Sequence, residues 1–70
     1  NLPKVFKVDK SIYFQIMTEG LYEIENGKPV LISDNIIFKE SILVNIFLNE
    51  ENKLLFQTQN KVLILHYLNS

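Results

Sequence analysis

The 70-residue chain has no cysteine, no tryptophan, no arginine, no alanine and a single histidine, His66. Without cysteine it cannot form a disulfide, and one histidine cannot supply the usual nitrogen and sulfur ligands of a structural zinc site. A chain this short buries only about 60% of the surface that its unfolded form exposes. Because covalent and metal staples are excluded, we expect the fold to depend on a partner surface.

The chain also lacks an excess of charge of either sign. Seven lysines face eight acidic residues, for a net charge of -1, and these charges are scattered along the chain. This excludes a phosphate-binding patch and a polybasic membrane motif, so we expect no nucleic acid or membrane contact through this segment. No apolar run approaches the roughly 18 residues that span a bilayer. The opening residues 1–4 are not a signal peptide and are typical of a segment taken from within a longer protein.

The side chains that carry catalysis are nearly absent. Gly20 and Gly27 are the only glycines, which excludes a phosphate-binding loop, and no serine has the surroundings of a nucleophile. His66 lies in an apolar stretch beside Tyr67, where a histidine is usually structural. We therefore predict no catalytic residue, no metal ligand and no cofactor, so the segment is not an enzyme.

Two acidic pairs, Glu23/Glu25 and Glu50/Glu51, could be imagined as glycosidase carboxylates or calcium ligands. The first pair alternates along a strand and the second falls in a turn. We interpret both as solvent-facing side chains. The tyrosines are interpreted as core or cross-strand residues rather than sugar-stacking ones.

What the chain has in abundance is β-branched and aromatic residues in short alternating runs. These runs predict seven strands, at residues 4–8, 11–17, 21–25, 29–32, 42–48, 54–58 and 62–67. Asn26-Gly27 predicts a type I′ hairpin turn, because both positions tolerate positive φ. Pro29 cannot donate to a ladder, so its strand is expected at a sheet edge.

Alternation along 21–25 places Tyr22 and Ile24 on one face and Leu21 with the two glutamates on the other. Residues 42–48 are almost continuously apolar, which predicts burial on both faces. A helix over 41–49 is the alternative, but isoleucine, valine, phenylalanine and asparagine are poor helix formers. Residues 34–40 are expected to be an irregular connection.

The chain repeats itself. When the sequence is aligned with itself at an offset of 42 positions, Ile12 falls on Leu54. The same offset aligns the turn at Thr18-Glu19 with the turn at Asn60-Lys61. The identical pairs at this offset are Phe14/Phe56, Gln15/Gln57 and Leu21/Leu63. Chance similarity between two amphipathic hairpins is the alternative explanation.

A period of about 40 to 45 residues with four short strands per unit is typical of a β-propeller blade. Blades are antiparallel sheets packed face to face around an axis. We therefore predict one all-β segment over residues 1–70, with a four-stranded blade at 4–33 and a three-stranded blade at 42–69, as part of a larger propeller.

Residues 12–28 (IYFQIMTEGLYEIENGK) and 52–63 (NKLLFQTQNKVL) resemble the two-component regulator propeller repeats. These repeats form the periplasmic sensor domains of hybrid histidine kinases and one-component regulators of Bacteroidetes. The residues that match the repeat pattern are Tyr13, Gly20, Leu21, Thr58 and Leu63. The departures are Ile16 in place of threonine, Val62 in place of glycine, and the missing tryptophan.

The resemblance implies a non-catalytic segment of a periplasmic sensor that binds a carbohydrate and passes the signal to a kinase or DNA-binding domain elsewhere in a parent anchored in the inner membrane. Its partners would be neighbouring blades of the same chain or a dimer partner. A small stand-alone β domain with a structural or protein-interaction role is the alternative.

In a propeller, the turn between the second and third strands and the connection between blades share one rim. This places Thr18-Glu19, Asn60-Lys61 and the connection 34–40 together. Within the connection, Phe38, Lys39 and Glu40 are the candidate ligand-binding residues. Strands that line the central channel are the alternative location.

Overall fold

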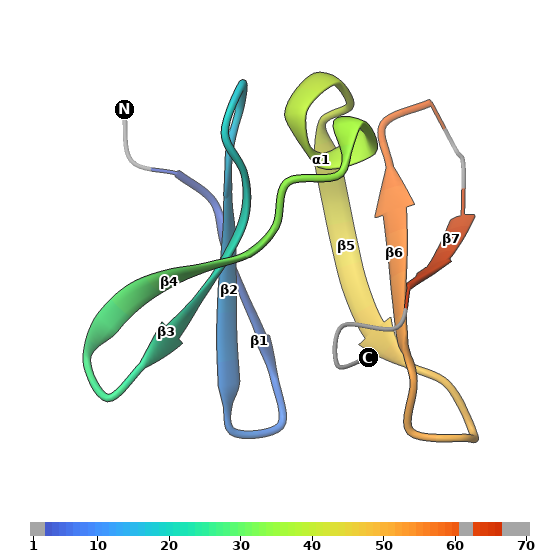
Figure 1. Cartoon of the computed structure of the whole chain (residues 1–70). Coiled ribbons are helices and arrows are strands. Elements are labelled where there is room, and N and C mark those ends of the chain that lie inside the picture. The colour runs from blue at the N-terminus through green and yellow to red at the C-terminus, as the bar shows by residue number, and fades with distance from the viewer. Residues whose placement is uncertain (1–2, 61–62, 67–70) are drawn as a thin grey trace.

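The computed structural model describes residues 3–60 and the backbone of residues 63–66. In this part of the chain, seven strands and one short helix follow one another (Figure 1). The elements are β1 (Val5–Val8), β2 (Ser11–Ile16), β3 (Gly20–Glu25), β4 (Lys28–Ser33), α1 (Ile36–Glu40), β5 (Leu43–Leu48), β6 (Leu54–Thr58) and β7 (Leu63–His66). The predicted all-β class is confirmed. The outer positions of the last predicted strand, Val62 and Tyr67, lie outside the described residues.

The strands form two antiparallel sheets. The first has the order β1-β2-β3-β4 and the second the order β5-β6-β7. Each strand pairs antiparallel with the next along the chain within its sheet. Short hairpin turns connect β1 to β2, β2 to β3, β3 to β4 and β5 to β6. Asn26 and Gly27 have φ of 54° and 78°, as the predicted type I′ turn requires. Pro29 lies on β4, an edge strand, as predicted.

The connection between the sheets contains α1, where an irregular segment was expected. Asn35 begins the helix, and its side-chain Oδ1 accepts a hydrogen bond from the Ile37 N–H at 3.0 Å. Ser41 follows the last turn and donates its N–H to the Ile37 carbonyl. The helix ends at Glu40 because the backbone of Ser41 is extended, with φ −114° and ψ 132°. The alternative helix over 41–49 is wrong, because β5 occupies that stretch.

The two hairpins at the centre of the repeat have the same register. In the first sheet Tyr13 pairs with Glu23 and Phe14 with Tyr22. The pairs at the repeat-related positions of the second sheet are Leu55/Leu65, Phe56/Ile64 and Gln57/Leu63. Each lies 42 positions after its counterpart in the first sheet. The similarity noted in the sequence is therefore a similarity of strand pairing as well.

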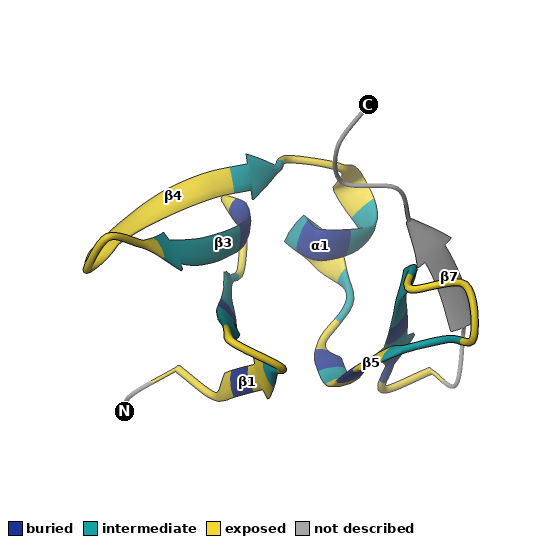
Figure 2. Ribbon diagram, turned by 90° about the horizontal axis from the view of Figure 1, so that it is seen from below, coloured by how far each residue is buried: buried dark blue, intermediate teal, exposed yellow. Residues whose placement is uncertain are grey.

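The two sheets stand side by side, with α1 between them (Figure 2). They approach each other most closely at β1 and β5, the first strand of each sheet, and spread apart from there. The Lys4 Nζ donates to the Val44 carbonyl at 3.2 Å across this junction. Val44 lies at a β-bulge, where the pairing of β5 with β6 shifts register between Leu43 and Asn45.

Both sheets and the helix contribute to one core. Its buried members are Phe6, Tyr13, Leu21, Phe38, Leu43, Ile46 and Phe56. Phe38 of α1 lies against Phe56 of β6 edge to face, with ring centroids 4.9 Å apart. The helix is thus the wedge that fills the space between the diverging sheets.

Two predictions about faces need correction. The face of β3 that carries Leu21 and Glu23 points into the core, and only Glu25 at its far end is exposed. On β5 the predicted burial of both faces is wrong, because Phe47 is 36% exposed. Leu43 and Ile46 pack against the first sheet, but among the described residues no element covers the opposite face.

Gly20 is fixed by its surroundings as well as by its backbone. Its φ is +135°, and a Cβ at this position would lie 2.2 Å from the Ser33 carbonyl oxygen of β4. Gly27 has a φ of +78° but nothing within 4 Å of the same position. Both substitutions to alanine strain the backbone, but only the first also forces β4 away from β3.

We expect Gly20→Ala to lower the free energy of unfolding by roughly 3 kcal/mol and Gly27→Ala by about 1 kcal/mol. Urea denaturation followed by circular dichroism compares the two variants under identical conditions. Equal losses would mean that the close approach of β4 to Gly20 is not a constraint on the fold.

Candidate functional site

The β2–β3 turn lies against the connection between the sheets. The Thr18 N–H donates to the Lys39 carbonyl of α1 at 3.1 Å. In Figure 1 this turn, α1 and the end of β6 all lie at the top of the molecule. We call the surface formed by residues 18–19, α1 and Asn60 the rim. The sequence predicted that these segments share one end of the molecule, and the structure joins two of them, the β2–β3 turn and α1, through the Thr18–Lys39 hydrogen bond.

The three candidate ligand residues of α1 occupy different environments. Phe38 is 1% exposed and belongs to the core, so its side chain is not part of the rim surface. Lys39 is half-buried and Glu40 is exposed. Asn60 is exposed too, and its predicted neighbour Lys61 lies outside the described residues. The polar rim side chains on α1 are therefore Lys39 and Glu40.

Gln15 holds the connection in place from the adjacent strand. Its Nε2 donates to the carbonyls of Phe38 at 2.8 Å and Ser41 at 2.6 Å. Its Oε1 accepts a hydrogen bond from the Leu43 N–H at 2.9 Å. Both amide N–H groups and the amide oxygen thus have partners on the chain between α1 and β5. The sequence signalled this residue only through its identity with Gln57 in the repeat.

Gln57 occupies the repeat-related place in the second sheet but has a different environment. It is half-buried, and within residues 3–60 the structure gives its side chain no hydrogen bond. The segment that Gln15 binds lies between the two sheets, whereas Gln57 faces away from the first sheet. The same residue type therefore fixes the connection in the first sheet, whereas in the second sheet it has no hydrogen bond to a described residue.

Tyr22 and Glu19 form a polar pair beside the β2–β3 turn. The Tyr22 hydroxyl donates to the Glu19 Oε1, and the Tyr22 ring stacks on Phe14 with centroids 5.2 Å apart. The hydrogen bond to Glu19 raises the pKa of the Tyr22 phenol, with smaller contributions from burial and from the negative charge of Glu19. This pair orients an aromatic hydroxyl toward the rim.

Tyr13 lies in the core rather than on a binding surface. Burial raises the pKa of its phenol, and the negative charge of Glu23 adds to this, while a hydrogen bond with Ser11 acts in the opposite direction. Tyr13 is 6% exposed, which agrees with its interpretation as a core residue.

Thr58 at the end of β6 has a buried hydroxyl without a partner. Its side chain is 2% exposed, and the structure gives its Oγ1 no hydrogen bond in the described part of the chain. The repeat-related residue of the first sheet is Ile16, which carries no polar atom there. A buried hydroxyl is unfavourable for folding unless it finds a hydrogen-bond partner.

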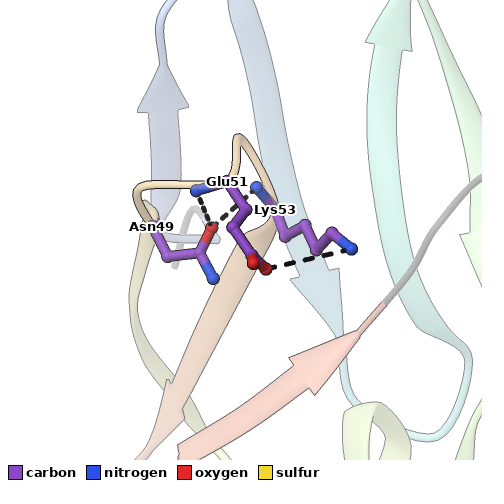
Figure 3. Close-up of polar contacts among 3 residues, drawn as sticks. All are labelled: Asn49, Glu51 and Lys53. Carbon is purple, nitrogen blue, oxygen red and sulfur yellow. Dashed lines mark hydrogen bonds and ion pairs between the residues drawn. The ribbon is translucent and has the colours of Figure 1, made fainter.

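The acidic pairs do not build a metal site. Glu50 and Glu51 are exposed in the turn between β5 and β6, as predicted. The Asn49 Oδ1 accepts hydrogen bonds from the N–H groups of Glu51 and Lys53, and the Glu51 carboxylate lies 4.0 Å from the Lys53 Nζ (Figure 3). Among residues whose side chains are described, no cluster of three potential ligands exists.

His66 ends β7, and its side chain lies outside the described residues. The one helix found in the described ranges, α1, is neither long nor apolar enough to cross a membrane.

No protein-family model, no curated protein and no solved structure matches this chain.

The contrast between the two glutamines predicts unequal effects of one substitution. Gln15→Leu leaves two carbonyls and the Leu43 N–H without their partner, so we expect a loss of about 2 to 3 kcal/mol in the free energy of unfolding. Gln57→Leu removes no hydrogen bond given by the structure, and we expect a change within about 0.5 kcal/mol. Urea denaturation of both variants measures the difference, and equal losses would contradict the role of Gln15 as a clamp.

The Tyr22–Glu19 hydrogen bond predicts a change in titration. Because the pKa of Tyr22 is raised in the fold, the bond stabilises the protein below the unfolded value of about 10 and is lost as pH rises through the folded pKa. Replacing Glu19 by alanine is expected to lower the pKa of Tyr22 and to leave that of Tyr13 unchanged. Site-resolved NMR titration of the tyrosine ring carbons reads both, and an unaltered Tyr22 curve would rule out the bond.

Proposed function

We propose that this chain is a non-catalytic segment of a β-propeller sensor domain in a two-component-type regulator. The observation that supports this most is the relation between the sheets. Two antiparallel sheets with the same central register stand side by side, with their first strands β1 and β5 nearest each other. Successive propeller blades have this relation, with the first strand of each blade closest to the axis.

The rim is the surface that we assign to ligand recognition. Lys39 and Glu40 place a cation and an anion at consecutive positions of α1, and Glu19 in the neighbouring β2–β3 turn holds the hydroxyl of Tyr22. Sugar hydroxyls both donate and accept hydrogen bonds, so a surface of this mixed character suits an oligosaccharide. Asn60 extends the same surface toward the second sheet.

The rim is also connected to the core, which gives a bound ligand a way to act on the fold. Lys39 and Glu40 follow Phe38, whose ring fills the space between the sheets. A ligand that shifts α1 would therefore also shift Phe38 and change the packing of one sheet against the other. The signalling chemistry itself belongs to other parts of the parent protein, and the periplasmic location is proposed from the family resemblance.

A stand-alone β domain that binds other proteins is the second candidate. It is favoured by the apolar side chains that remain exposed in this chain, of which Val5 at 57% and Ile36 at 63% are the largest fractions. Such a module would be monomeric in solution and would not need its rim for binding.

The sensor proposal is tested by NMR titration of the full chain with a panel of neutral and acidic oligosaccharides. We expect at least one class to shift the amide signals of Thr18, Lys39 and Glu40, and the combined Lys39→Ala and Glu40→Ala variant to lose this response. The matched control replaces Glu25 and Lys28, an exposed acid and lysine at the β3–β4 turn, by alanine. Binding that survives the first variant, or no binding by any class, would overturn the proposal.

A further inference from the structure

Residues at the same place in the two sheets differ sharply in burial. Phe6 pairs with Tyr13 across β1 and β2, and Phe47 pairs with Leu55 across β5 and β6. Since Tyr13 and Leu55 are related by the repeat, the two phenylalanines are counterparts. Phe6 is 8% exposed and lies in the core, whereas Phe47 is 36% exposed.

The opposite faces of the sheets show the reverse difference. Val5 pairs with Phe14 in the first sheet, and Ile46 pairs with Phe56 in the second. Val5 is 57% exposed, whereas its counterpart Ile46 is 6% exposed. Phe56 is fully buried, and Phe14 only partly so. The sheets therefore pack through opposite faces of the same repeat unit.

Within the described ranges, each sheet consequently leaves uncovered the face that its counterpart uses in the core. The first free face, on the β1–β4 sheet, includes Val5, Phe14, Ile16, Tyr22 and Leu31. The second free face, on the β5–β7 sheet, includes Asn45, Phe47, Leu55 and Gln57. The first free face is equivalent by the repeat to the face of the second sheet that packs against the first sheet. The second free face is equivalent to the face of the first sheet that packs against the second sheet.

The composition of the two free faces suits contact between them. Lys7 shares a face with Val5 and Phe14 and lies on the edge strand β1. The Glu19 carboxylate is bound to the Tyr22 hydroxyl at the β2–β3 turn, at the end of this face. The strand residues Asn45, Phe47, Leu55 and Gln57 of the second free face carry no charge, and Lys53 precedes β6 at the turn end of this face, 4.0 Å from the Glu51 carboxylate. Bringing these faces together therefore buries apolar side chains without opposing like charges.

We propose that a second copy of this chain docks head to tail, with the second free face of one copy against the first free face of the next. In this contact Phe47 and Leu55 take the places that Phe6 and Tyr13 have in the core, and Val5 and Phe14 take those of Ile46 and Phe56. The contact repeats between copies the packing that the chain already makes within itself. It rests on the blade arrangement proposed above and is independent of carbohydrate binding.

The symmetry of this contact has a consequence for assembly. The two surfaces are different, so the contact is heterologous and does not close after two copies. Each docked copy offers the same free face again, and association continues into a ring or an open chain. A dimer that pairs one face with itself would instead stop at two copies.

The test uses two variants, each blocked on one face only. Val5→Glu with Leu31→Glu blocks the first free face, and Asn45→Glu with Phe47→Glu blocks the second. All four side chains are exposed, so the fold should tolerate the changes. Because a carboxylate would be buried without a partner, we expect each blocked variant to associate at least about 100-fold more weakly than the unmodified chain.

Sedimentation velocity over a range of concentrations gives the outcome. The unmodified chain is expected to associate beyond the dimer and each variant alone to remain monomeric. An equimolar mixture of the two variants should form a dimer with one copy of each, because one intact contact remains. The control Ile36→Glu changes an exposed apolar residue of α1 outside both faces and should associate like the unmodified chain.

Three results would overturn the inference: an unmodified chain that is monomeric throughout, a blocked variant that still dimerises with itself, or a mixture that forms no mixed dimer. Any of these leaves the sensor proposal standing if the oligosaccharide titration is positive. A negative titration with a mixed dimer present would remove the sensor proposal and leave the docking intact.

Discussion

The packing of the two sheets depends on how the chain crosses between them, and Gln15 makes that crossing possible. After β4, the chain must return from the outer edge of the first sheet to the start of β5, which lies against β1. The backbone of this return segment has carbonyl and N–H groups facing the sheet junction, where they would lack partners. The amide of Gln15 satisfies three of them, at Phe38, Ser41 and Leu43.

That constraint links the core to the rim. With the end of α1 fixed by Gln15 and its Lys39 carbonyl held by Thr18, the helix has one orientation, and this places Phe38 between the sheets. The same orientation leaves Glu40 exposed at the end of the molecule. The residues proposed to contact a ligand are therefore positioned by the same hydrogen bonds, from Gln15 and Thr18, that hold α1 against the core.

The sequence predicted the features that depend on local signals. Strand positions follow from alternation and β-branched residues, and the Asn26-Gly27 turn follows from the positive φ that both residues tolerate.

The features that were missed depend on contacts distant in sequence. Phe38 looked like a rim residue because nothing near it shows that Phe56 covers its ring. Periodicity likewise separates the faces of β3 without showing which of them the second sheet covers. The same holds for the candidate site. The sequence placed the rim segments at one end of the molecule, but it could not show that Gln15 binds the backbone of the connection.

The central claim is that the two sheets are one repeat unit packed through opposite faces. Nuclear Overhauser contacts within the monomeric core test it directly. The account predicts contacts that join Phe6 and Leu21 of the first sheet to Ile46 and Phe56 of the second. Contacts from Phe14 or Tyr22 to Phe56 within one molecule would show equivalent faces meeting each other and would contradict it.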